Sequence, residues 1–138
     1  MKKFLSLCVA VMVMLTASLF TACKKEPLVI NESDTFVIVS VETNRADLTL
    51  ANYMASLQEY KDEFEIKNGM VVSINGIKNA SDYSACWMLY TNDYSEDISN
   101  SVWGTVEYKG VIYNSSAYGA ESLVVKNGYK YIWVYETF

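Results

Sequence analysis

The sequence has no histidine, which removes the commonest general base and the commonest metal ligand among the side chains. Without histidine, neither a Ser-His nor a Cys-His nucleophile can be assembled. The chain of 138 residues also has only three cysteines and one proline. Apolar residues make up 51% of it, so it can build a core and is not a disordered tail. We therefore expect one small domain that is not an enzyme.

The first 22 residues have the pattern of an export signal. Lys2 and Lys3 precede an apolar run over residues 4–20, and small residues follow it. The segment Leu19-Phe20-Thr21-Ala22-Cys23 closely resembles the lipobox of bacterial lipoproteins, in which the cysteine receives a diacylglyceryl thioether and becomes the first mature residue. This resemblance predicts an exported, extracytoplasmic protein held on the cell membrane through Cys23. An uncleaved membrane anchor and ordinary signal cleavage with an incidental cysteine are the alternatives.

The mature chain is acidic. Removing residues 1–22 takes away two of the 11 basic residues and none of the 16 acidic ones, which leaves a net charge of −7. An acidic surface repels phosphate backbones, so we expect no nucleic-acid partner and attachment to the bilayer through lipid alone. Cys8 leaves with the signal and Cys23 is taken by lipid, so Cys86 has no partner for an intrachain disulfide.

The mature chain is expected to divide at residue 36. Residues 23–35 combine charged side chains with Pro27 and predict a lipidated tether. Residues 36–41 are β-branched and aromatic, which predicts a first strand. Apolar residues then recur at helical spacing over residues 50–60, behind Thr49 as a possible N-cap. This is the one convincing helix of the domain at residues 36–138.

Turn signals punctuate the remaining chain. The dipeptides Asn68-Gly69, Asn75-Gly76 and Asn127-Gly128 tolerate the positive φ angles of a type I′ hairpin turn, and Lys109-Gly110 separates two apolar runs in the same way. Further strands are expected at residues 65–67, 70–74, 85–91, 105–108, 111–113, 123–126 and 129–136. We predict an α+β domain, with a single helix packed on an antiparallel or mixed β-sheet that contains several hairpins.

Four segments occur in a distinctive order: Leu48-Thr49-Leu50, Gly69 with residues 73–77, Trp87-Met88-Leu89-Tyr90, and residues 127–136. In this order they resemble the transcobalamin-type C-terminal domain, a family of small bacterial secreted and lipoprotein domains, over residues 36–138. The resemblance implies a β-grasp-like fold and a ligand-binding role without catalysis. In the cobalamin carriers of animals the similar domain caps a corrinoid, so a corrinoid is the implied ligand. The positions that carry over are Trp87, Tyr90 and Trp133.

Aromatic side chains alternate along the closing strand. Tyr129, Tyr131, Trp133 and Tyr135 share one face, which could stack a planar ligand or a sugar ring. The same face could instead pack under the helix as core. Trp87 and Tyr90 on the strand at 85–91 point to opposite faces of that strand, so at most one of them can join this stripe. The candidate ligand-binding residues are therefore Trp87, Tyr90, Tyr131, Trp133 and Tyr135.

Two further features suggest chemistry only weakly. Asp93, Ser95, Asp97 and Ser99 present alternating oxygens that could meet calcium, but the loop lacks the glycine and the glutamate of an EF-hand. We favour a solvated acidic loop and assign no metal and no cofactor. Cys86 has no basic neighbour in sequence to activate its thiol, so we expect it in the core.

The leading hypothesis is a lipid-anchored surface protein with a small non-catalytic ligand-binding domain. A corrinoid taken up by the cell is the ligand that the resemblance implies. The alternative is a cell-surface interaction module whose aromatic face contacts a protein or a glycan. An enzyme is not expected, because no nucleophile in the sequence has an activating partner.

The lipobox predicts that Cys23 is the acylated residue. Replacing Cys23 by alanine should abolish incorporation of labelled fatty acid and move the protein out of the lipid-anchored fraction, because acyl chains supply the membrane affinity. Metabolic labelling followed by fractionation measures both effects. Cys86→Ala is the matched control and should keep the label. Acyl incorporation that persists in the Cys23→Ala variant would contradict the anchor.

Overall fold

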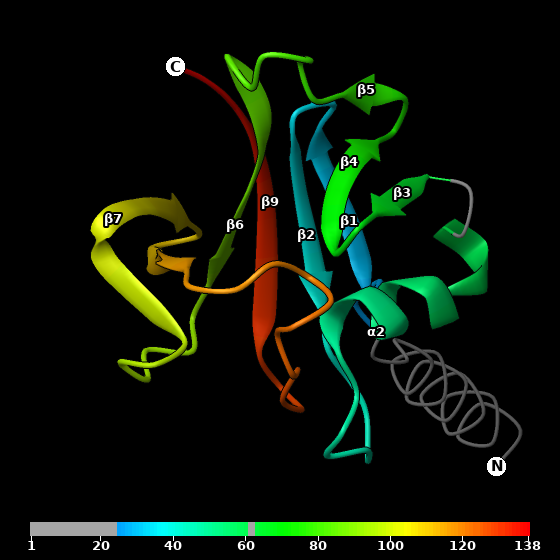
Figure 1. Cartoon of the computed structure of the whole chain (residues 1–138). Helices are drawn as coiled ribbons and strands as arrows, with labels where there is room; N and C mark the ends of the chain where they lie inside the picture. The colour runs from blue at the N-terminus through cyan, green and yellow to red at the C-terminus, as the bar shows by residue number, and fades with distance from the viewer. Residues whose placement is uncertain (1–24, 61–62) are drawn as a thin grey trace, which may run out of the picture.

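A six-stranded antiparallel sheet forms the body of the protein (Figure 1). The computed structural model describes residues 25–60 and 63–138, so the predicted lipidation site Cys23 lies outside the described residues. The strand order is β1-β2-β9-β6-β8-β7. The strands span Val29–Ser33 (β1), Phe36–Ser40 (β2), Ala85–Thr91 (β6), Ser99–Tyr108 (β7), Val111–Ser116 (β8) and Lys130–Thr137 (β9).

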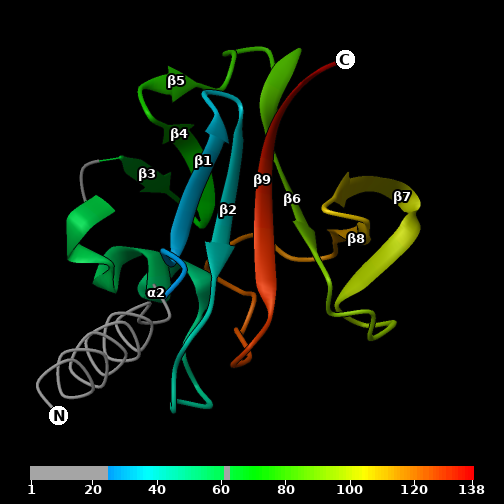
Figure 2. The ribbon, with the colours of Figure 1, turned by 180° about the vertical axis from the view of Figure 1, so that it is seen from behind.

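A small second sheet and a short helix lie over one face of the main sheet (Figures 1 and 2). The small sheet has the order β3-β4-β5, with strands at Phe64–Lys67, Met70–Ile74 and Ile77–Lys78. The helix α2 spans Leu50–Ser56, and a 3-10 helix, η2, follows at Gln58–Tyr60. The prediction of an α+β domain with a single helix on an antiparallel or mixed sheet is compatible with this architecture, in which the described residues form two antiparallel sheets and one short α-helix. None of the helices in that part of the chain has the length and apolarity that a membrane crossing needs.

Helix α2 begins where its capping residue predicts. The Thr49 hydroxyl accepts a hydrogen bond from the Asn52 amide at 3.3 Å, which satisfies one of the free donors of the first turn. The face that carries Leu50 and Met54 is fully buried. The helix ends at Ser56, earlier than the expected residue 60, because Leu57 leaves helical geometry and its amide bonds to the Met54 carbonyl at 3.2 Å.

Three of the four predicted turns have type I′ geometry. Both residues have positive φ in Asn68-Gly69 (48° and 81°), Asn75-Gly76 (51° and 79°) and Lys109-Gly110 (49° and 76°). In the fourth dipeptide only Gly128 has positive φ, at 83°, so Asn127-Gly128 is a turn of another type. The three dipeptides with type I′ geometry each join two paired strands directly, whereas Asn127-Gly128 lies in the segment before β9.

Two further predictions about element boundaries are wrong. The predicted tether includes β1, which pairs antiparallel with β2 and buries Val29, so the folded domain begins before residue 36. The predicted strand at 123–126 is not a strand: only Val124 forms an isolated bridge, with Thr49. The backbone there bonds instead to the start of α2, with the Leu50 amide donating to the Leu123 carbonyl at 2.8 Å.

Both faces of the main sheet are buried at its centre. Tyr131 and Trp133 of β9 pack into a core under α2 and the small sheet, while Ile132 packs into a core on the other side. The hairpin of β7 and β8 reaches across this second face. Its residue Tyr108 lies 6.0 Å from Phe36 of β2, measured between ring centroids. The long edge strand β7 therefore bends back toward the opposite edge of the sheet.

Gly104 lies at the bend in β7. The pairing of β7 with β8 shifts register between Asn100 and Thr105, and Gly104 has φ of 133°, a conformation that side chains rarely adopt. A Cβ atom placed there would lie 3.5 Å from the Tyr90 hydroxyl, so backbone strain, with no clash, sets the cost of substitution.

Gly104→Ala should lower the free energy of unfolding by about 1–3 kcal/mol, because alanine must adopt a strained backbone. Urea denaturation measures the change. Ser101→Ala, at an exposed position of the same segment, is the control and should stay within about 0.5 kcal/mol of the parent protein. Equal stability of the two variants would show that the bend does not depend on this glycine.

Candidate ligand pocket

The main sheet splits between β6 and β8. Strand β6 pairs with β9 along its whole length, from Ala85 with Thr137 to Thr91 with Tyr131. On its other side β6 pairs with β8 only through Tyr90 and Thr91. The residues of β6 before Tyr90 therefore have no strand partner on that side within the described part of the chain.

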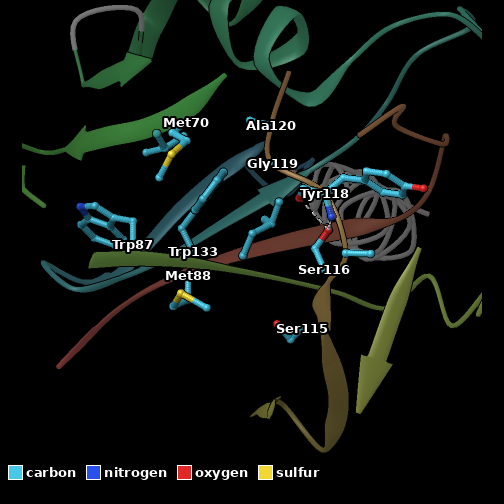
Figure 3. A pocket seen from close by; sticks show the side chains of 12 residues that line it. Met70, Trp87, Met88, Ser115, Ser116, Tyr118, Gly119, Ala120 and Trp133 are labelled. Atoms are coloured by element: carbon cyan, nitrogen blue, oxygen red, sulfur yellow. Dashed lines mark hydrogen bonds between the residues drawn. The ribbon is translucent and has the colours of Figure 1, made fainter. Parts of the chain in front are cut away.

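A pocket of about 210 Å³ opens at this split (Figure 3). Its wall is formed by Met70 and Val71 of β4, residues 87–89 of β6, Trp133 of β9, and residues 115–120 from the end of β8 and the loop that follows. In Figure 3, Met88 lies on the other side of β6 from Trp87. The pocket thus runs past the free edge of the strand and meets side chains from both of its faces.

The loop after β8 is held in place by its own hydrogen bonds. The Ser116 hydroxyl donates to the Tyr118 carbonyl at 3.0 Å and accepts from the Tyr118 amide at 3.2 Å. Gly119 passes close to the turn between β3 and β4, since a Cβ there would lie 3.0 Å from the Gly69 carbonyl oxygen. The Ala120 carbonyl accepts the Ala51 amide of α2 at 2.8 Å. These contacts keep the pocket wall apart from β6.

The wall of the pocket is uncharged and contains one unusual donor. No lining residue among those described carries a charge, and the wall is made of apolar, aromatic and small hydroxyl side chains. The Trp133 side chain is buried, and its Nε1 has no hydrogen-bond partner within the described structure. By contrast, Nε1 of Trp87 donates to the Ile77 carbonyl at 2.8 Å. A buried N–H without a partner costs about 1–3 kcal/mol.

The predicted aromatic stripe is divided between core and half-buried positions. Tyr131 and Trp133 are 0% and 3% exposed, so the core alternative describes them and their ring faces are not open to solvent. Tyr135 is half-buried, packs edge-on against Trp87 at 5.4 Å, and donates its hydroxyl to the Lys78 carbonyl. The physical reason is that α2 and the small sheet cover this face of β9.

Of the predicted binding residues, Trp87 and Trp133 come together in the pocket wall. Tyr90 lies on the opposite face of β6, as alternation predicts, and donates its hydroxyl to the Glu136 carboxylate at 2.5 Å. Burial and this carboxylate raise the pKa of Tyr90. Cys86 is half-buried, short of the core position expected for it, and burial raises the pKa of its thiol.

The sequence analysis missed Met70 and residues 115–120, which form the end of β8 and the loop that follows. Neither has a periodic pattern or a motif that marks a binding wall. The loop reads only as a polar connection, and Met70 only as the first residue of a strand. Their proximity to Trp87 and Trp133 follows from how β4 and β8 are placed around β6, which no local signal in the sequence records.

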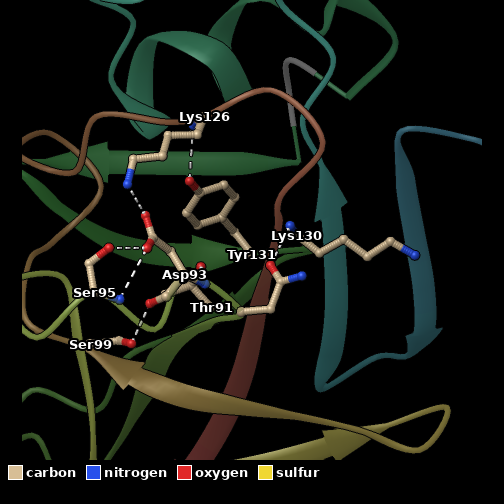
Figure 4. Close-up of polar contacts among 8 residues, drawn as sticks. Thr91, Asp93, Ser95, Ser99, Lys126, Lys130 and Tyr131 are labelled. Atoms are coloured by element: carbon tan, nitrogen blue, oxygen red, sulfur yellow. Dashed lines mark hydrogen bonds and ion pairs between the residues drawn. The ribbon is translucent and has the colours of Figure 1, made fainter.

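The acidic loop after β6 forms a polar network with the segment that precedes β9 (Figure 4). The buried Asp93 carboxylate accepts Lys126 Nζ at 2.6 Å and the Ser95 hydroxyl at 2.7 Å. The Ser99 hydroxyl donates to the Asp93 backbone carbonyl at 2.5 Å. The described residues contain no group of three or more acidic or cysteine side chains that could hold a metal ion. Asp93, considered as a calcium ligand, instead fastens this loop to Lys126.

The pKa of Asp93 reflects two opposed effects. Burial alone would raise the pKa of the carboxyl, but the hydrogen bonds from Lys126 and Ser95 outweigh it and hold the pKa below the ordinary value. Because the folded pKa is lower than the unfolded one, this carboxylate stabilises the folded protein above the unfolded pKa. That contribution is lost as the pH falls through the folded pKa.

No known family model, curated protein or solved structure matches this chain. The resemblance to the transcobalamin-type domain, which comes from the order of sequence segments, therefore stays a prediction.

Lys126→Met should lower the free energy of unfolding by about 1–3 kcal/mol at neutral pH, because it leaves Asp93 buried without its cation. The gap from the parent protein should narrow toward about pH 3, where Asp93 of the variant is protonated. Urea unfolding at several pH values measures both. Lys130→Met is the control, since Lys130 Nζ lies 4.0 Å from the exposed Glu26 carboxylate and should contribute little. A loss that does not change with pH would mean that Lys126 acts through packing alone.

Proposed function

We propose that this protein is an exported, lipid-anchored, non-catalytic ligand-binding domain, and that the pocket between β6 and β8 is its binding site. The observation that carries the proposal is the split in the main sheet. Strand β6 pairs with β9 along its whole length but with β8 only at Tyr90 and Thr91. A pocket with uncharged lining residues lies beside the unpaired edge of β6. Binding sites are typically concave and mostly apolar, with a few polar groups that fix orientation.

The chemistry of the pocket favours holding a ligand over transforming it. The wall presents the hydroxyls of Ser115, Ser116 and Tyr118, but within the described residues none of its members could act as a base toward them. The Ser116 hydroxyl is already engaged with the backbone of Tyr118.

The size of the pocket favours a ligand smaller than a corrinoid. The pocket holds about 210 Å³, and an apolar cavity of about 150 Å³ is enough to bind benzene. A corrinoid, which the family resemblance suggests, could engage this pocket only through an edge or a substituent. With the ring faces of Tyr131 and Trp133 buried, stacking a corrinoid on them would require part of the core to open.

The anchor and the fold complete the proposal. Five residues separate the proposed lipid at Cys23 from Val29, where β1 begins, so the domain would sit within about 20 Å of the membrane. We also propose that the arrangement is β-grasp-like. What supports this is one helix laid over one face of an antiparallel sheet.

One observation favours the alternative, a protein- or glycan-binding module. The β7–β8 hairpin exposes four large apolar side chains: Val102 at 86%, Trp103 at 58%, Ile112 at 53% and Val111 at 42%. Exposed apolar residues that gather on one element are typical of contact surfaces. If the pocket takes no ligand, this hairpin is the surface to test next.

A pocket-filling substitution tests the proposal. Ala117 is exposed but lines the pocket, so Ala117→Phe should fill the opening without disturbing the core. Ala46→Phe, at an exposed position away from the pocket, is the matched control. Ligand-observed NMR with a library of ring-sized fragments should find binders of the parent protein and of the control. Their affinity for Ala117→Phe should fall by about tenfold or more, or 1.4 kcal/mol.

Urea unfolding should give the two variants the same stability within about 0.5 kcal/mol, since both positions are exposed. Fragments that bind both variants equally, or the absence of any binder, would contradict the proposed site.

A further inference from the structure

We infer that the ligand of this pocket is a small uncharged molecule, about one ring in size, whose carbonyl or similar acceptor pairs with the indole N–H of Trp133. This inference rests on the proposed function and names the ligand class of the same site. It follows from three observations: the volume of the pocket, the lack of charge in its wall, and the buried, unpartnered N–H of Trp133, which is one of the lining residues.

The lack of charge disfavours the commonest classes of small metabolite. A carboxylate, phosphate or ammonium group that entered the pocket would meet no opposite charge in the described wall to offset the hydration it gives up. A neutral ring loses little hydration and gains contact with Trp87 and the thioethers of Met70 and Met88. The pocket therefore selects for uncharged, mostly apolar molecules.

The unpartnered donor adds a polar requirement. Nε1 of Trp133 has almost no solvent-accessible surface and no hydrogen-bond partner in the described structure, so water does not satisfy it from the pocket. An acceptor on the ligand would replace no existing hydrogen bond at this nitrogen, so the only hydrogen bonds lost on binding are those between the acceptor and water. The neighbouring Trp87 cannot play this role, because its N–H already donates to the Ile77 carbonyl.

Access to this nitrogen requires a side chain to move. Met70 lies on the same side of β6 as Trp87 and Trp133 in Figure 3, and it is 47% exposed. Its unbranched side chain can change rotamer without disturbing a packed core. We therefore expect a ligand to displace Met70 as its acceptor approaches the indole.

Two probes of equal shape separate the acceptor from the ring. Acetophenone carries a carbonyl where α-methylstyrene carries a carbon–carbon double bond, and benzoate carries a charged carboxylate. The full chain is reconstituted in phosphatidylcholine nanodiscs, with 15N in the indole groups of its three tryptophans. Phenylalanine substitutions at Trp87, Trp103 and Trp133 assign the three indole signals. If Trp133→Phe does not fold, the other two variants assign Trp133 by elimination.

Acetophenone should move the Trp133 indole proton signal downfield in a saturable way and leave the Trp87 signal in its hydrogen-bonded position. It should bind about 3- to 10-fold tighter than α-methylstyrene, the ratio expected for one added hydrogen bond. Benzoate should bind more weakly than either. Ala117→Phe should weaken the binding of both neutral probes, and a methyl-labelled Met70 signal should move with the indole signal.

The outcomes distinguish the ligand class from the function itself. If α-methylstyrene or benzoate binds as well as acetophenone, and Ala117→Phe still weakens binding, the pocket binds ligands but the acceptor requirement is wrong. The same conclusion follows if acetophenone binds without moving the Trp133 signal. If no ring-sized fragment binds in a manner that Ala117→Phe weakens, the proposed function fails and the ligand class with it.

Discussion

The burial of β9 on both faces and along both edges is the constraint on which the rest of the structure depends. Its edges pair with β2 and β6, while Tyr131 and Trp133 point into one core and Ile132 into the other. A strand in this position must be apolar on both faces, whereas a strand of a sheet with one solvent-exposed face needs apolar residues on the covered face only. Covering the two faces then requires α2 and the small sheet on one side and the β7–β8 hairpin on the other.

The pocket arises where strand β8 ends. Strand β8 pairs with β6 only through Asn114 and Ser115 and stops at Ser116, while β6 pairs with β9 along its whole length. The chain after Ser116 turns away from β6 and reaches the start of α2, where the Ala120 carbonyl accepts the Ala51 amide. An opening therefore remains beside Trp87. The other end of the β7–β8 hairpin bends across the second face toward Phe36 of β2, and Gly104 lies where the register of β7 with β8 shifts.

Polar contacts fasten the loops at one end of the main sheet. Asp93 and Lys126 join the loop after β6 to the segment before β9, and this segment also reaches the start of α2 through the Leu123 carbonyl. The Lys126 amide donates to the hydroxyl of Tyr131, whose pKa burial raises to about 12. The segment before β9 is therefore bonded to Tyr131 in the core, to the loop after β6 and to the start of α2.

Features that depend on a few neighbouring residues can be predicted from the sequence. Thr49 begins a helix and Asn75-Gly76 forms a type I′ turn because their own backbone and side-chain chemistry suffices. Alternation likewise separates Trp87 from Tyr90, and the absence of histidine holds for any fold. By contrast, the burial of Tyr131 and Trp133 in the core and the pairing of Val29–Ser33 as a strand emerge only in the folded chain. Burial and strand pairing depend on partners far away in the chain, and so does a pocket whose wall draws on residues 70 to 133.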